Sequence, residues 1–358
     1  MMANLLFLED KIENPGGGVQ TLITMEEKLS EEHQTKFLWM DTEDREDSYN
    51  FFSRKISQVF PLEIGRLGYF LEPRLRGSLE QRISEIDPDI IFAQKRTGEI
   101  ALQYAEGRDV KVVLVLHDFE LLYDKEHTHR GNRLISRIVN ASLRPINSRF
   151  SSRVLDGVDK IIFNSKFTAE KYGYEEKSEI IYPLIDTSKY KVDVEGEKIL
   201  HVKPSKIKGI KTTLVVAEEM EDQEFLVTGS AEDEIQERMM ELDNVEYVGY
   251  QEDMKDAYRK SKIVLVPSTE KETFGRIPIE AGVNGIPAIV SGKGGLKEAV
   301  GYEEFVVEEN TPEAYISKIK DVERNYEDYS SKARKNAEDK DYTKFIPKLR
   351  EIVEELME

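Results

Sequence analysis

The 358-residue sequence contains no cysteine, which excludes disulfide bonds and thiolate metal sites. It also contains no run of 18 apolar residues, the length that a membrane-spanning helix needs. The first eleven residues, MMANLLFLEDK, lack the basic region and the long apolar core of a signal peptide. We therefore expect a cytoplasmic protein.

Basic residues are scarce as well, because 51 Lys and Arg stand against 70 Asp and Glu, for a net charge of −19. Such a charge disfavours binding to nucleic acid. The imbalance is uneven: residues 1–185 hold 25 basic and 31 acidic residues, and the remainder holds 26 and 39. The N-terminal half is therefore the one that we expect to meet an anionic partner.

The length exceeds the roughly 250–300 residues at which a single core usually stops growing, so we expect two domains. In both halves short apolar strands alternate with helical segments, a pattern typical of doubly wound α/β domains. The expected strands are 4–8, 87–94, 111–118, 159–165, 179–184, 198–203, 224–229, 244–249, 263–266 and one within 286–300. We assign residues 1–187 to the first domain, 196–340 to the second, and 341–358 to a helix that packs back on the first. Residues 41–82 are polar and irregular.

The segment 267–285, PSTEKETFGRIPIEAGVNG, follows an apolar strand and leads into a helix that begins near Arg276, with Pro278 in its first turn. Glu272 and Glu280 are separated by seven residues, and Phe274 and Gly275 lie between them. A helix N-terminus attracts anions, while ionised carboxylates accept hydrogen bonds from hydroxyls. The pattern indicates a ligand with both phosphate and hydroxyl groups, such as a sugar nucleotide, or else an acidic loop without a ligand.

Two further loops suit a diphosphate. Gly16, Gly17 and Gly18 occupy a strand-to-helix turn, where glycine lets the backbone approach a ligand closely. This turn is neither GxGxxG nor a P-loop, which argues against nicotinamide cofactors and ATP chemistry. Lys203 ends a strand, and Lys208 precedes a helix N-terminus, so the two ammonium groups are a candidate diphosphate clamp. A ligand-free glycine turn and a solvated lysine loop are the alternatives.

The strand 111–118 delivers His117 and Asp118 at its carboxyl end, where ligands of α/β sheets bind. Asp87-Pro-Asp89 precedes its strand, so we interpret it as a turn and not as a metal motif. From Arg130 to Leu155 there are six arginines and no acidic residue, with apolar residues at helical spacing and a break at Pro145. Such helices lie on an anionic membrane, receive a phosphorylated acceptor or pack on the sheet.

Taken in order, these segments resemble the retaining glycosyltransferases of family 4, which have the GT-B fold. The resemblance covers PGGGVQ, the His-Asp pair, KPSKIKG and the block PSTEKETFGRIPIEAGVNGIPAIVSGKGGLKEAV. The last block carries the family's E-x7-E pattern with FG inside it. The resemblance implies an α/β protein of two Rossmann-like domains that face each other across a cleft, with the nucleotide held mainly by the C-terminal domain.

The resemblance also implies a role for each site residue. In the second domain, Lys203 and Lys208 would bind the diphosphate, and Glu280 would bind the ribose. Glu272 would bind the donor sugar together with the backbone of Phe274, Gly275, Arg276 and Ile277. In the first domain, Gly17 and Gly18 would approach the diphosphate, Gln20 would contact the acceptor, and His117 would contact the transferred sugar. The chain departs from the family pattern in Lys203, where an arginine is usual, in Val202, where a glycine is usual, and in Gln94, where many relatives carry histidine.

The implied activity is transfer of a hexose from a UDP- or GDP-linked sugar to an acceptor hydroxyl, with retention and without a metal or cofactor. The implied acceptors are glycans or lipid-linked molecules, and Arg130–Arg153 would contact the cytoplasmic face of an anionic membrane. A sugar-nucleotide 2-epimerase of the same architecture and a non-catalytic sugar-nucleotide-binding module are the alternatives. Epimerised donor would favour the first, and binding without turnover would favour the second.

Overall fold

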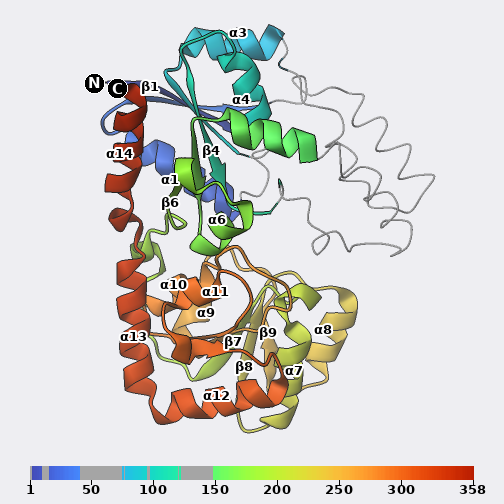
Figure 1. Ribbon diagram of the computed structural model, residues 1–358. Helices are drawn as coiled ribbons and strands as arrows, with labels where there is room; N and C mark the ends of the chain where they lie inside the picture. The colour runs from blue at the N-terminus through green and yellow to red at the C-terminus, as the bar shows by residue number, and fades with distance from the viewer. Residues whose placement is uncertain are drawn as a thin grey trace, which may run out of the picture. The chain divides into compact units, whose positions relative to one another are not determined.

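The computed structural model describes residues 2–9, 16–40, 75, 77–94, 97–119, 121 and 148–358. The chain divides into two compact units (Figure 1). Unit 1 comprises Met1–Asn164, Thr168–Ile181 and Ile346–Glu358, and unit 2 comprises Ser165–Phe167 and Tyr182–Phe345.

The described part of unit 1 contains a parallel sheet of six strands in the order β2-β1-β3-β4-β5-β6. The strands are β1 (Asn4–Glu9), β2 (Gln34–Trp39), β3 (Ile90–Ala93), β4 (Lys111–Leu116), β5 (Lys160–Phe163) and β6 (Ser178–Ile180). The central strands are continuous apolar runs and are buried almost throughout, as expected for a parallel sheet with helices on both faces. The edge strand β2 is more exposed.

Helices cover this sheet. They are α1 (Gly17–Leu29), α3 (Gly77–Ile86), α4 (Thr97–Ala105), most of α6 (Lys166–Tyr172), a helical segment at 148–157, and α14 (Ile346–Met357). α14 lies against α1 (Figure 1). It buries the apolar side chains of Ile346, Leu349, Ile352 and Val353, whose spacing places them on one helix face.

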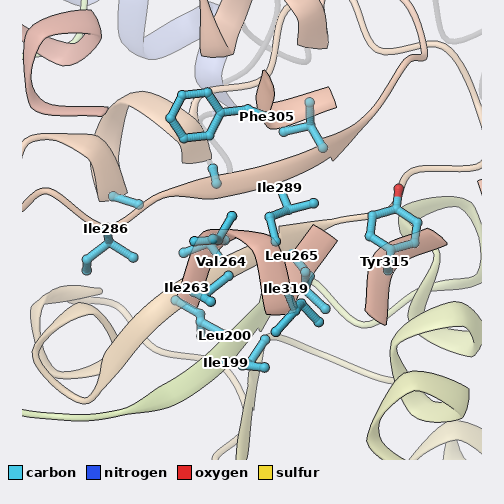
Figure 2. Close-up of a cluster of buried hydrophobic side chains, with 14 of the residues drawn as sticks. Ile199, Leu200, Ile263, Val264, Leu265, Ile286, Ile289, Phe305, Tyr315 and Ile319 are labelled. Carbon is cyan, nitrogen blue, oxygen red and sulfur yellow. The ribbon is translucent and has the colours of Figure 1, made fainter. Parts of the chain in front are cut away.

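The described part of unit 2 also contains a six-stranded parallel sheet, in the order β12-β11-β10-β7-β8-β9. The strands are β7 (Lys198–Val202), β8 (Phe225–Thr228), β9 (Val245–Tyr247), β10 (Ser261–Val266), β11 (Ala288–Ser291) and β12 (Val306–Val307). Figure 2 shows the core of this unit, where Ile199 and Leu200 of β7 lie near Val264 and Leu265 of β10 and Ile289 of β11.

The helical elements of unit 2 are η4 (Thr187–Tyr190), η5 (Lys206–Lys208), α7 (Ile210–Glu219), α8 (Asp233–Met240), α9 (Lys255–Arg259), α10 (Ile277–Gly282), α11 (Leu296–Val300), η6 (Glu303–Phe305), α12 (Pro312–Arg324), α13 (Tyr326–Asp339) and η7 (Tyr342–Lys344). α10 packs closely on α13, because Gly282 has no side chain there: a Cβ would lie 2.7 Å from the backbone oxygen of Ala333. This packing fixes the short helix that follows the Glu272 loop.

Two doubly wound, parallel α/β units confirm the predicted fold class. The segment 41–82 was interpreted as polar and irregular, but α3 begins at Gly77, so this interpretation was wrong for its last residues. Of the predicted basic helices between Arg130 and Leu155, residues 130–147 lie outside the described residues, and the remainder is helical. No helix in the described part of the chain is both long and apolar enough to cross a membrane.

Candidate functional site

The strand order of unit 2 marks one position at the edge of its sheet. β7 and β10 are neighbours, and the chain proceeds outward from β7 to β9 on one side and from β10 to β12 on the other. In open α/β sheets, ligands bind beyond the carboxyl ends of the strands at such a reversal. Lys203 follows β7, and Pro267 follows β10. The predicted lysine and glutamate loops therefore start at the same switch point.

The loops after β7 and β10 are in direct contact. Gly209, next to Lys208, has a φ of +77°, and a Cβ at this position would lie 1.9 Å from the backbone oxygen of Pro267. Glycine alone permits both the conformation and the approach. The Thr269 backbone N–H donates to the backbone oxygen of Ile207 at 2.9 Å. The two loops thus form one surface at the carboxyl ends of β7 and β10.

Lys203 presents an exposed cation at this edge. Its φ of +62° is rare for a residue with a side chain, and its backbone N–H donates to the Thr228 oxygen at 2.8 Å. A Cβ at Gly229 would lie 2.9 Å from the Lys203 Cα, so the strand ends pack tightly here. Among the described residues, the Lys203 ammonium has neither an ion pair nor a hydrogen bond. It is therefore available to an anionic ligand.

Glu272 is held by two side chains. Its Oε2 accepts from Nζ of Lys208 at 2.9 Å, and its Oε1 accepts a short hydrogen bond from the Ser268 hydroxyl. The structure thus brings two of the predicted site residues, Lys208 and Glu272, into contact. The predicted roles had placed them on different parts of one ligand, and the ion pair between them was not foreseen.

The backbone between Glu272 and α10 is shaped by one glycine. Gly275 has a φ of +106°, and a Cβ there would lie 2.6 Å from the Leu296 side chain. The Phe274 ring is buried and stacks on Tyr182 with ring centroids 5.0 Å apart. Phe274 therefore anchors the loop through its side chain. Its backbone, with that of Gly275, Arg276 and Ile277, is the part that a ligand would meet, as the resemblance implies.

Glu280 lies on α10 and is only 6% exposed. Both of its carboxylate oxygens are engaged: Oε1 accepts from Nε of Arg276, and Oε2 accepts from the Tyr258 hydroxyl, each at 3.0 Å. Arg276 also donates from Nη2 to the Tyr190 hydroxyl at 3.2 Å. A carboxylate has about four acceptor positions, so Glu280 keeps capacity for further donors. The sequence pattern did not reveal Tyr190 or Tyr258, which lie far from Glu280 along the chain.

The pKa values of Tyr258, Tyr190 and Arg276 are all raised in this cluster. Burial and the Glu280 carboxylate raise the pKa of the Tyr258 hydroxyl well above its ordinary value. The same two causes raise the pKa of Tyr190. Burial alone would lower the pKa of Arg276, but the Glu280 carboxylate outweighs it, so this pKa is raised. Both tyrosines therefore stay hydrogen-bond donors at neutral pH.

Unit 1 has a switch point of its own, between β1 and β3. Gly17 is the first residue of α1, and a Cβ at Gly18 would lie 3.1 Å from Cβ of His117. Gln94, directly after β3, donates from Nε2 to the Gly18 oxygen at 3.1 Å. Gly18 and His117 are therefore packed together, as their placement at one sheet edge predicts.

The loop that carries His117 is fixed by neighbouring elements. Asn164, which follows β5, donates from Nδ2 to the His117 backbone oxygen at 3.2 Å. The Tyr172 hydroxyl donates to the backbone oxygen of Asp118 at 3.1 Å. Gln20 lies exposed in the first turn of α1. Gly17, Gly18, Gln20 and His117 belong to unit 1 and all the other predicted site residues to unit 2, so a site shared by the two units stays a prediction.

Other sequence interpretations concern parts of unit 1 outside the predicted site. Asp89 accepts a hydrogen bond from the Asn4 backbone N–H at 2.7 Å, directly before β3. Asp87-Pro-Asp89 therefore lies at the amino ends of β1 and β3, the edge opposite the predicted site, as expected. Within the described residues no cluster of three His, Asp or Glu side chains could hold a metal ion. In the basic segment, Arg153 donates from Nε to buried Glu99 at 3.1 Å. The membrane contact of Arg130–Arg153 stays a prediction.

Two family models match consecutive parts of the chain. Residues 15–189 match Glycosyltransferase Family 4, and residues 188–340 match Glycosyl transferases group 1. These matches assign the two parts of the chain to two glycosyltransferase families, and the two doubly wound units agree with the GT-B architecture.

Solved structures with the same fold align over nearly the whole chain. Anabaena HepE in complex with UDP-glucose has a TM-score of 0.70 at 17% identity, covering 98% of this chain and 99% of that chain. A glycosyltransferase from Rickettsia africae has a TM-score of 0.72 at 16% identity, covering 100% and 99%. Sucrose-phosphate synthase from Thermosynechococcus elongatus has a TM-score of 0.71 at 14% identity, covering 99% and 98%. These alignments confirm the GT-B fold.

A curated protein is similar over part of the sequence. Mannosylfructose-phosphate synthase of Agrobacterium fabrum is 28% identical over 136 residues. The match covers 37% of this chain and 29% of that protein. The chain therefore spans less than a third of this relative's length.

Proposed function

We propose that this chain is a retaining glycosyltransferase that moves a hexose from a UDP- or GDP-linked sugar to an acceptor hydroxyl. The observation that carries the proposal is the Lys208–Glu272 pair at the carboxyl ends of β7 and β10. An ammonium group suits a diphosphate, and a carboxylate suits the hydroxyls of a sugar. A cation and a carboxylate at one switch point therefore suit a ligand that carries both groups.

Comparison with solved structures supports the donor class. Anabaena HepE has been solved with UDP and with UDP-glucose, which makes UDP-glucose the first donor to test on this chain. In the proposed site, Glu272 and the backbone of residues 274–277 hold the sugar, and Glu280 accepts hydrogen bonds from the ribose. Arg276 and Tyr258 hold the Glu280 carboxylate in place for that contact.

The demanding step is departure of the nucleoside diphosphate, because positive charge develops on the sugar ring as negative charge builds on the phosphates. In the proposed site, Lys203 and Lys208 bind the phosphates more tightly as that charge grows, which lowers the barrier. In the proposed reaction these ammonium groups neutralise the leaving group, and no metal or cofactor takes part.

We propose that the acceptor attacks the sugar from the face that the diphosphate leaves, which retains the anomeric configuration. The bond from the anomeric carbon to the diphosphate oxygen breaks, a bond to the acceptor oxygen forms, and the acceptor proton passes to the leaving diphosphate. We assign no carboxylate as a covalent nucleophile. His117 would contact the transferred sugar, and Gly17 and Gly18 the diphosphate.

The proposed acceptor is a glycan or a lipid-linked molecule, met by unit 1 near Gln20. We further propose that the enzyme works in the cytoplasm, at an anionic membrane surface, as the arginines of Arg130–Arg153 indicate. Failure to bind anionic vesicles at low salt would contradict the membrane contact.

A thermal-shift screen tests the proposed function. A ligand that binds the native state alone raises the melting temperature by mass action, so UDP, UDP-glucose, GDP and GDP-mannose are compared in turn. The stabilising nucleotide sugar is then incubated with candidate acceptors, and nucleoside diphosphate is measured. Acceptor-dependent release supports transfer. Epimerised donor without acceptor, or binding without any turnover, would contradict it.

A further inference from the structure

Ser268 carries a buried hydroxyl two residues after the end of β10, and it has no role in the proposed reaction so far. It is 1% exposed, and it donates its hydrogen bond to Oε1 of Glu272. The direction is certain because an ionised carboxylate can only accept. Glu272 thus accepts a hydrogen bond from the neutral Ser268 hydroxyl at Oε1 and forms an ion pair with the Lys208 ammonium at Oε2.

The backbone of Ser268 is itself anchored by other elements. Its oxygen accepts from Nδ2 of Asn310 at 3.3 Å, and Oδ1 of Asn310 accepts from the Tyr315 hydroxyl at 2.8 Å. Tyr315 lies on α12 and is fully buried. On the other side, the next residue, Thr269, donates through its backbone N–H to Ile207. Because hydrogen bonds hold the chain on both sides, the backbone that carries the Ser268 side chain is fixed in place.

The two side chains that contact Glu272, Lys208 and Ser268, differ in how freely they can move. The Lys208 side chain is 31% exposed and carries three N–H donors, so it can turn toward a phosphate oxygen. Ser268 is enclosed and has a single donor. When a diphosphate draws Lys208 away, Ser268 is the group that still orients the carboxylate.

We propose that Ser268 is a positioning residue that aims Glu272 at the hydroxyls of the donor sugar, an inference that rests on the proposed function. The role concerns the sugar and not the nucleotide. Ser268→Ala should therefore weaken binding of UDP-glucose about tenfold, the low end of what a hydrogen bond to a charged group contributes. Binding of UDP, which lacks the transferred hexose that Glu272 would hold, should stay within about twofold of the wild type.

The experiment is calorimetric titration of the full chain with UDP and with UDP-glucose, or with GDP and GDP-mannose if the wild type prefers guanine. Ser268→Cys keeps the size of the side chain with a weaker donor and should fall between the wild type and Ser268→Ala. Ser261→Ala is the matched control, because Ser261 is also buried, starts β10, the strand that precedes Ser268, and donates to the Ala257 oxygen at 2.5 Å. The Ser261→Ala control should not weaken the binding of one ligand more than that of the other. Urea unfolding of each variant reports its stability.

If Ser268→Ala loses affinity for the nucleotide sugar but not for the nucleotide, the positioning role is supported. Equal weakening of nucleotide and nucleotide sugar, or no change in either, would overturn it and leave the proposed function standing. If the wild type bound none of the four ligands, the proposed function itself would fail, and the role of Ser268 would fall with it.

Discussion

At the scale of single residues, the cluster of Arg276, Glu280 and Tyr258 shows how strongly a buried charge depends on its partner. Arg276 carries a permanent charge, and its side chain is only 19% exposed. Glu280 supplies the balancing charge and is enclosed with it. Removing one partner of such a pair leaves an uncompensated buried charge, which costs far more than the intact pair contributes.

Glu280→Gln should therefore lower the free energy of unfolding by roughly 3 kcal/mol, because the Arg276 guanidinium loses its balancing charge. Tyr258→Phe, which removes one hydrogen bond to the same carboxylate, should cost about 1 kcal/mol. Urea unfolding of both variants measures the difference. Equal, small losses in the two variants would show that Arg276 is not buried with Glu280.

Lys203→Ala should depress kcat/KM about 100-fold, because the variant loses a cation that stabilises the leaving diphosphate. Lys206→Ala is the matched control, since Lys206 lies in the same loop but pairs with Glu232 and Glu234 at 3.2 Å. Steady-state kinetics with the donor found in the thermal-shift screen measure both. Near-normal activity of Lys203→Ala would remove this residue from the proposed site.

His201 makes stability depend on pH. Burial, and then the Lys208 charge, lower the pKa of His201 to about 3 from the ordinary 6.5. Below pH 6.5 the unfolded chain therefore binds a proton that the folded chain refuses, and stability falls as the pH drops through this window. For this proton the loss between pH 7 and 5 is about 2 kcal/mol.

His201→Val should remove this part of the pH dependence. The free energy of unfolding of the variant should fall less than that of the wild type between pH 7 and 5, by about 2 kcal/mol. Urea unfolding at the two pH values gives the comparison. Identical pH dependence in both proteins would show that His201 titrates normally in the fold.

At this scale, the sequence predicted candidate site residues but not all of the contacts between them. Lys208 and Glu272 were placed in one site because their motifs resemble those of family 4 glycosyltransferases, and each motif follows a recognisable apolar strand. Their direct pairing could not be read, because it depends on how two loops touch. The partners of Glu280 show the same limit, since Tyr190 and Tyr258 carry no local signal that sets them apart from core tyrosines.

At the scale of elements, the strands that position the site were predictable because parallel strands buried on both faces are continuous apolar runs. β2 was left unassigned because an edge strand is partly exposed and its sequence, QTKFLW, mixes polar and apolar residues. β12 has only two residues, too few for any pattern. The start of helix α10 was predicted from Pro278, because proline is favoured in the first turn of a helix.

The terminal helix α14 packs on unit 1 through its apolar face and through an ion pair at 3.0 Å between Arg350 and Glu31. Leu349→Ala should lower the free energy of unfolding by roughly 3 kcal/mol, because it opens a cavity at a fully buried position. Glu354→Ala, on the exposed face of the same helix, should change it by less than about 0.5 kcal/mol. Urea unfolding distinguishes them, and equal effects would contradict the packing of α14.

At the scale of the whole molecule, the net charge of −19 repels phosphates in general. Several lysines of unit 2 pair with acidic side chains, as Lys198 does with Glu224 and Glu246. Lys203 has no ion pair among the described residues, and it lies at the switch point of the sheet. We therefore expect local contacts at the carboxyl ends of β7 and β10, and not the overall charge, to attract an anionic ligand.

The most direct test of this account is calorimetric titration of the wild type, Lys208→Ala and Lys206→Ala with UDP-glucose or GDP-mannose. The account predicts that the wild type and Lys206→Ala bind the nucleotide sugar alike, and that Lys208→Ala binds it at least tenfold more weakly. Unchanged affinity in Lys208→Ala would contradict a donor site at the carboxyl ends of β7 and β10.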